Sequence, residues 1–170
     1  QLEGFERYKH AAYFALWFDP RVGKTKVIYD IFQYRYDRGD VDTLIILSFP
    51  SGVKYVWQEE ISKDFHPKIL DKTEFVLWYS GITASKARRQ SLLDFRTHDG
   101  PLIISMNCEA VSTKHGFNYI EWLLAKRKVM LVLDEAAWAA RWSTRTKKIL
   151  TLGGWFKRGT AKGQRDGLVI

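Results

Sequence analysis

The chain carries the stretch Phe18-Asp19-Pro20-Arg21-Val22-Gly23-Lys24-Thr25-Lys26 between an apolar run at 13–17 and a segment at 27–32 whose apolar residues recur at helical spacing. The apolar run is short enough for a buried strand. A strand that turns sharply into a helix directs backbone N–H groups at one point, where the helix N-terminus adds a positive dipole end. Gly-Lys-Thr in this context predicts a phosphate-binding loop, with Lys24 on the β- and γ-phosphates and the Thr25 hydroxyl on Mg²⁺.

The loop departs from the full phosphate-loop pattern at one position. That pattern has a glycine five residues before Gly23, where this chain has Phe18. The alternative interpretation of Gly-Lys-Thr on its own is a turn at Gly23 followed by an ordinary helix start. A second motif elsewhere in the chain is therefore needed to favour nucleotide binding.

Such a motif follows about 110 residues later, where the apolar run 129–133 ends in Asp134-Glu135. The continuous apolar pattern is typical of a strand buried on both faces. In open α/β sheets the ligand crevice lies outside the carboxyl ends of the strands. Asp134 can hold Mg²⁺ there, usually through water, and Glu135 can orient and deprotonate an attacking water. The alternative is a solvated acidic turn.

Composition indicates one folded domain over 1–170, because 46% of the 170 residues are hydrophobic and 15% are aromatic. No apolar run approaches the roughly 18 residues needed to span a membrane, so no membrane partner is expected. The net charge of +8 favours a polyanion such as nucleic acid, the alternative being a generic basic surface. The basic residues cluster at 86–89, at Lys126-Arg127-Lys128 and along 141–165.

Strand and helix patterns alternate along the chain, which predicts an α/β fold with a parallel sheet and helices on both faces. The expected strands are 13–18, 43–48, 74–79, 102–106, 128–133 and 167–170. The expected helices are 2–9, 24–37, 53–63, 84–95, 116–126 and 143–151, the last with Ser143 as its N-cap.

Several segments occur in an order that is more specific than any one of them. They are Gln1-Leu2-Glu3-Gly4-Phe5, Asp19–Thr25, Ser48–Val53 followed by Trp57 and Glu60, Met106–Ala110, and Asp134–Ala137. Together they resemble the first RecA-like lobe of a superfamily 2 helicase of the Swi/Snf-type DNA translocase branch, with bacteriophage members nearest. The resemblance covers nearly the whole chain and implies a three-layer RecA-like P-loop NTPase domain with a mostly parallel central sheet.

The resemblance implies a role for each site residue. Lys24 and Glu135 are the expected catalytic residues, and Thr25 and Asp134 the expected Mg²⁺ ligands. The expected ATP-binding residues are Gln1, which would face the adenine edge, and Arg21, Val22, Gly23, Lys24, Thr25 and Lys26. The segment from Ser48 to Glu60 is similar to the family's contact with the DNA backbone.

The chain also departs from the family pattern. Arg21 stands where many relatives have glycine, and Ala137-Trp138 is apolar where His or a small polar residue is usual. The Thr-Gly-Thr-Pro of motif III is not visible, although Gly167–Ile170 is similar to the strand that leads into it. The second RecA-like lobe, which supplies an arginine finger worth about 10³–10⁵ in rate in related systems, is absent from the chain.

The expected function is therefore the ATP-binding lobe of a DNA-dependent ATPase, in which hydrolysis of ATP to ADP and phosphate drives movement along nucleic acid, with double-stranded DNA contacted through its backbone. Alone, the lobe is expected to hydrolyse ATP weakly or not at all. The expected compartment is the cytoplasm, that of the host if a phage encodes the chain. The alternatives are a terminase-type packaging ATPase, with Arg21 as an arginine finger in the same lobe, and a non-catalytic nucleic-acid-binding module with a degenerate nucleotide site.

Overall fold

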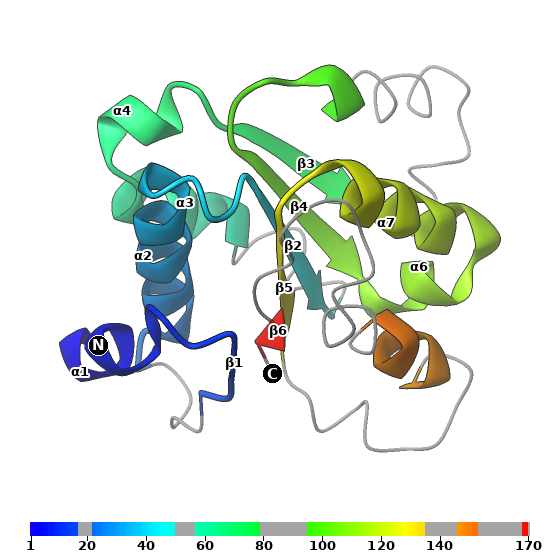
Figure 1. Cartoon of the computed structure of the whole chain (residues 1–170), viewed down its shortest axis with the longest axis horizontal. Helices are drawn as coiled ribbons and strands as arrows, with labels where there is room; N and C mark the ends of the chain where they lie inside the picture. The colour runs from blue at the N-terminus through cyan, green and yellow to red at the C-terminus, as the bar shows by residue number, and fades with distance from the viewer. Residues whose placement is uncertain (17–21, 50–56, 79–94, 135–145, 153–167, 170) are drawn as a thin grey trace.

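The computed structural model describes residues 1–16, 22–49, 57–78, 95–134, 146–152 and 168–169 (Figure 1). A helical segment without a label covers 146–152. In chain order the other elements are α1 (Leu2–Tyr8), β1 (Tyr13–Phe14), α2 (Lys24–Asp37), β2 (Thr43–Ser48), α3 (Trp57–Asp64), α4 (Pro67–Leu70), β3 (Glu74–Trp78), a 3-10 helix (Phe95–Thr97), β4 (Leu102–Asn107), α6 (Cys108–Ser112), α7 (Lys114–Lys126), β5 (Val129–Leu133) and β6 (Leu168–Val169).

A parallel sheet in the strand order β1-β6-β5-β2-β4-β3 forms the middle of the molecule. The four strands β5, β2, β4 and β3 are five or six residues long, whereas β1 and β6 have two residues each. Parallel strands need crossover connections, and described helices lie in the connections from β1 to β2, from β2 to β3 and from β4 to β5. The prediction of an α/β chain with a parallel sheet is therefore confirmed.

Strand β2 lies between β5 and β4 among the four longer strands, and its position shows why these strands are apolar. Its residues Thr43–Ser48 pair with Leu102–Asn107 of β4 on one side, and Thr43–Leu47 pair with Val129–Leu133 of β5 on the other. All residues of these three strands are buried. A strand with partners on both edges and helices on both faces has no side that favours polar residues, so its apolar run is continuous.

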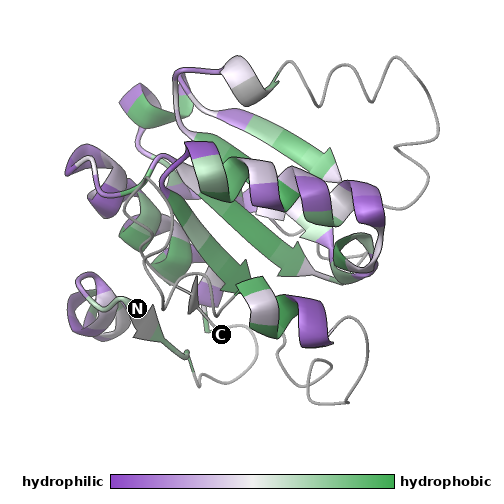
Figure 2. Ribbon diagram, turned by 45° about the vertical axis from the view of Figure 1, so that its right-hand side comes forward, coloured by the Kyte–Doolittle hydropathy of each residue, from purple (hydrophilic) through white to green (hydrophobic). Residues whose placement is uncertain are grey.

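Two apolar clusters separate the molecule into three layers, helices on either side of the sheet (Figure 1). Alternate strand residues, such as Leu44, Ile46 and Val132, face α1 to α4. The residues between them, such as Ile45 and Leu47, face α6, α7 and the 146–152 segment. Figure 2 shows mostly hydrophobic strands between helices that carry both hydrophilic and hydrophobic residues. Within the described ranges, no helix is both long and apolar enough to cross a lipid bilayer.

Helix α2 begins and ends where the sequence predicts. Gly23 is its N-cap with φ 84°, and Gly39, with φ 74°, follows its last turn. Both glycines have left-handed backbone conformations that other residues adopt at a cost. Helix α7 begins two residues before the predicted 116–126, because the Thr113 hydroxyl accepts a hydrogen bond from the Gly116 N–H at 3.0 Å and caps it.

Other predicted boundaries differ from the structure. Of the predicted strand 13–18, Tyr13–Phe14 form a strand, 15–16 do not, and 17–18 lie outside the described residues. The short helices α4 and α6 were not predicted because four or five residues carry too little periodicity. Of the predicted helices 53–63 and 143–151, the structure describes α3 from Trp57 and a helical segment from 146. Outside the described residues lie 53–56, 84–94 and 143–145, which include the proposed cap Ser143.

Arg127 joins the amino-terminal ends of three strands. Its guanidinium donates to the carbonyl oxygens of His98 (2.5 Å) and Gly100 (2.7 Å), which precede β4. It also donates to Asp42 Oδ1 (3.0 Å) and Thr43 Oγ1 (2.5 Å) at the start of β2. The sequence placed Arg127 in a basic cluster for a polyanion, but its side chain is only 10% exposed and is used inside the fold. The other basic clusters, at 86–89 and along most of 141–165, lie outside the described residues.

Candidate functional site

Polar side chains end three adjacent strands at the carboxyl edge of the sheet. Ser48 is the last residue of β2 and pairs in register with Asn107, the last residue of β4. Asp134 follows β5, and its N–H donates to the carbonyl oxygen of Leu47 at 2.8 Å. Because side chains alternate along a strand, all three lie on the face that α2 and α3 cover. This edge is where the sequence predicts a ligand crevice.

Asp134 is held by two side chains from other elements. The Ser48 hydroxyl donates to Asp134 Oδ2 at 2.9 Å, and the Trp57 indole N–H donates to the same oxygen at 3.3 Å. Ser48 and Trp57 are buried, whereas Asp134 is partly exposed. The carboxylate therefore has a fixed side toward the protein and can still meet a ligand from solvent.

Trp57 in turn connects Asp134 with helix α2. The Tyr29 hydroxyl, on α2, donates to the backbone carbonyl of Trp57, and the two rings meet edge to face with centroids 5.6 Å apart. Burial raises the pKa of the Tyr29 phenol well above its ordinary value, and the carboxylates of Asp64 and Glu60 raise it further. The phenol therefore stays protonated and remains a donor.

The predicted phosphate-binding loop is described from Val22 onward. Gly23 caps α2, whose first turn contains Lys24, Thr25 and Lys26 and no acidic residue. The α2 helix has 14 residues, so its N–H groups at this end and its dipole present a sizeable positive potential. Lys24 and Thr25 are partly exposed at this end. This end of α2 has the charge and donors that an anion needs.

Gln1 lies directly against this loop. Its side-chain Nε2 is 3.5 Å from the Val22 carbonyl oxygen, a long hydrogen bond. A Cβ added to Gly23 would come within 2.0 Å of the same Nε2. The left-handed turn therefore favours glycine, and the Gln1 amide lies in the space that a Cβ would take. The structure brings together Gln1, Val22 and Gly23, three residues that the resemblance assigns to ATP.

Replacing Gly23 with alanine is expected to lower the free energy of unfolding by about 1–2 kcal/mol, because alanine is strained at this φ. The matched control is Gly39→Ala, since Gly39 has φ +74° but no atom within 4 Å of an added Cβ. Urea unfolding of both variants should give similar losses. If the loop binds phosphate as the sequence predicts, only Gly23→Ala should weaken nucleotide binding, and wild-type affinity in that variant would contradict the predicted role of the loop.

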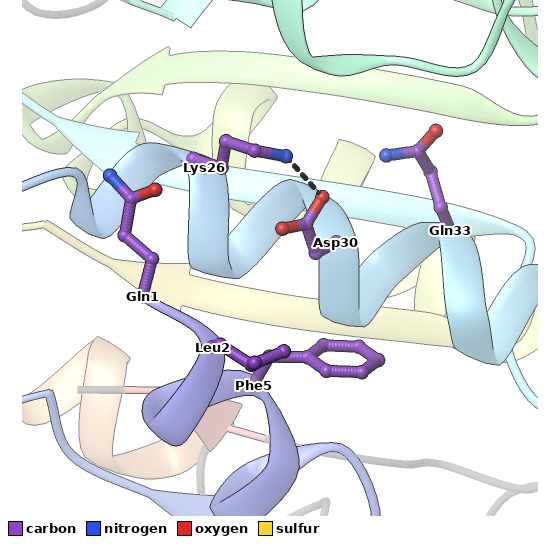
Figure 3. Close-up of a pocket in the computed structure, with 6 residues that line it drawn as sticks. All are labelled: Gln1, Leu2, Phe5, Lys26, Asp30 and Gln33. Atoms are coloured by element: carbon purple, nitrogen blue, oxygen red, sulfur yellow. Dashed lines mark hydrogen bonds and ion pairs between the residues drawn. The ribbon is translucent and has the colours of Figure 1, made fainter.

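A pocket of about 440 Å³ opens beside this loop, between α1 and α2 (Figure 3). Leu2 and Phe5 form an apolar side, and Lys26 Nζ is paired with Asp30 Oδ1 at 2.7 Å on the other. Lys26 was expected to bind the nucleotide directly, and here it has a carboxylate partner on its own helix. The lining residues are Gln1, Leu2, Phe5, Lys26, Asp30 and Gln33.

The strand register brings the two predicted motifs to one edge. Phe14 of β1 is level with Val169 of β6, and Val169 is level with Val132 of β5. Two strand spacings separate β1 from β5, roughly 10 Å. Because the strands are parallel, the chain that leads to Gly23 and the chain that leads to Asp134 leave the sheet in the same direction. Arg21 and Glu135 lie outside the described residues.

The sequence did not predict the contribution of some residues to this site. Trp57 belongs to the segment that resembles a DNA-backbone contact, but its own side chain is 3% exposed and donates to Asp134. Asn107 is 1% exposed, and its Oδ1 has no hydrogen-bond partner among the described residues. The available signal was a polar residue at the end of an apolar strand, which Ser48 and Asn107 share with Asp134.

Comparison with protein-family models and with curated proteins gives no match to this chain. Within the described residues, no three His, Cys, Asp or Glu side chains are grouped closely enough to hold a metal ion by themselves. The site instead combines the hydrogen-bonded Asp134 carboxylate, the Thr25 hydroxyl and the positive N-terminal end of α2. Such a set can bind a cation only together with an anionic ligand and water.

Proposed function

We propose that this chain is the ATP-binding lobe of a DNA-dependent ATPase of the helicase or translocase type. The observation that carries the proposal is the position of Asp134 and of the Gly23-capped start of α2 at one edge of a parallel sheet. The finer fold assignment, a RecA-like P-loop domain over 1–170, belongs to the same proposal.

The residues present fit a magnesium nucleotide. The first turn of α2 offers backbone N–H groups, Lys24 and Thr25 to phosphate, without an acidic side chain to repel it. Asp134 offers a single carboxylate, and Mg²⁺ in nucleotide sites is usually held by one or two carboxylates, phosphate and water. Gln1 and the apolar side of the neighbouring pocket would take the base.

The proposed reaction is hydrolysis of ATP to ADP and phosphate. Lys24 would offset negative charge on the β- and γ-phosphates, and Thr25 and Asp134 would hold Mg²⁺. Glu135 is proposed to orient the attacking water and accept its proton. When bound, Mg²⁺ supplies charge neutralisation at the phosphate oxygens. Positioning of this kind accounts for most catalysis of phosphoryl transfer.

The partners are part of the proposal. The net charge of +8 supports a polyanion, with double-stranded DNA contacted through its phosphates. A second RecA-like lobe would provide an arginine finger, so turnover by the chain alone should be slow. The proposed compartment is the cytoplasm, that of the host if the chain is phage-encoded.

The test is equilibrium binding of a fluorescent ATP analogue, with and without Mg²⁺. We expect binding that Mg²⁺ strengthens and that unlabelled ATP and ADP displace. Because most of the affinity is assigned to the β- and γ-phosphate contacts, AMP should compete at least tenfold less well. Equal competition by AMP, or no binding at any Mg²⁺ concentration, would overturn the proposal; salt-dependent DNA binding would then favour a non-catalytic nucleic-acid-binding module.

A further inference from the structure

The Asp134 carboxylate accepts hydrogen bonds from one residue of the sheet and one residue of a helix packed on it. Ser48 Oγ and Trp57 Nε1 both donate to Oδ2, at 2.9 and 3.3 Å. Ser48 belongs to the sheet, whereas Trp57 is the first residue of α3 in the helical layer. Two donors on one oxygen fix the plane of a carboxylate and hold that oxygen toward the protein.

Trp57 makes contacts within the fold in addition to the hydrogen bond of its indole N–H. Its side chain is 3% exposed, and it belongs to the apolar cluster beneath α2 and α3. Its carbonyl oxygen accepts the Tyr29 hydroxyl, and Tyr29 lies one helical turn after Thr25 on α2. Tyr29 is itself fixed by an edge-to-face contact with Phe65, with centroids 4.9 Å apart. Asp134 is thus connected through Trp57 to Tyr29, one turn after Thr25 in α2.

We infer that Trp57 is a positioning residue that aims Asp134 at the bound cation and couples the carboxylate to the phosphate-binding helix. The inference rests on the proposed function. Phenylalanine would fill nearly the same apolar space but would leave Asp134 Oδ2 with one donor fewer. Partners of this kind typically change metal affinity or activity 10- to 100-fold when they are removed. Packing alone does not require an indole N–H at this position.

The experiment compares Trp57→Phe with wild type in binding of the fluorescent ATP analogue, titrated with Mg²⁺. We expect half-maximal enhancement to need about tenfold more Mg²⁺ in the variant, with Mg²⁺-free binding unchanged. The matched control is Trp122→Phe, because Trp122 packs on the opposite face of the sheet. If Trp57→Phe keeps the wild-type Mg²⁺ dependence, the inference is wrong while the proposed function stands.

A second readout needs no nucleotide. In ¹H–¹⁵N spectra, the indole N–H signal that Trp57→Phe removes is assigned to Trp57. We expect Asp134→Ala to move this signal upfield, because its acceptor is lost, and to leave the Trp122 indole unmoved. An unmoved Trp57 signal would overturn the contact itself. A wild-type chain that binds no nucleotide overturns the proposed function, and with it the role of Trp57 at the cation, even where the signal moves.

Discussion

Replacing Lys24 with alanine is expected to weaken binding of the magnesium–ATP analogue by about 10- to 100-fold, because a charged hydrogen bond to phosphate contributes roughly 1.5–3 kcal/mol. Lys24 is the first residue of α2, next to the Gly23 turn, where helix dipole and side-chain charge act on the same ligand. Fluorescence anisotropy at fixed salt measures the loss. Thermal unfolding without nucleotide should change little, since the side chain is partly exposed.

The control for this prediction is Lys114→Ala. Lys114 is also the first residue of a long helix, α7, but that helix covers the other face of the sheet. The two substitutions remove the same charge from the same helix position, so a general effect of net charge on nucleotide binding would appear in both. Equal losses of affinity in the two variants, or wild-type affinity in Lys24→Ala, would contradict the proposed phosphate-binding role of this loop.

The sheet could be predicted because its strands are buried on both faces. Thr43–Ser48, Leu102–Asn107 and Val129–Leu133 are each a mostly apolar run of strand length, as expected for strands that are buried on both faces. Helix α2 could be predicted because glycines mark both of its ends. Helices α4 and α6 could not, since four or five residues are too few to show a period.

The candidate site was predictable only where a motif is local. Gly23-Lys24-Thr25 and Asp134 can be recognised within a few residues of sequence, but the groups that hold Asp134 cannot. Ser48 and Trp57 are separated from it by 86 and 77 positions, and neither spacing has a sequence signature. The pairing depends on strand order and register, which follow from packing of the whole sheet.

The same limit explains Arg127, which the sequence assigned to a basic surface. Lys126-Arg127-Lys128 looks uniform as a sequence, but Lys126 is exposed, Arg127 pairs with Asp42 85 positions away, and Lys128 donates to the Gly39 carbonyl oxygen. A guanidinium has five N–H donors in a fixed plane, which suits a site with two carbonyl oxygens and a carboxylate. A lysine or arginine in the sequence predicts a positive charge. It does not predict whether that charge contacts solvent, a ligand or the backbone of the same chain.

Replacing Arg127 with methionine is therefore expected to lower the free energy of unfolding by about 3 kcal/mol and the melting temperature by about 10 °C. Methionine keeps much of the length of the side chain, but the carbonyl oxygens of His98 and Gly100 lose their donors. Each such group costs roughly 1–3 kcal/mol when it stays buried without a partner. Asp42 is 34% exposed, so water partly compensates its carboxylate.

Lys126→Met is the matched control, because Lys126 is exposed and adjacent and the charge change is identical. Urea unfolding should place it within about 0.5 kcal/mol of wild type. Arg127→Lys should fall between the two, since an ammonium group keeps the charge but cannot reach both carbonyl oxygens and Asp42 at once. If Arg127→Met is as stable as Lys126→Met, the guanidinium does not hold the amino-terminal edge of the sheet together. If it unfolds early while Arg127→Lys does not, charge rather than hydrogen-bond geometry stabilises that edge.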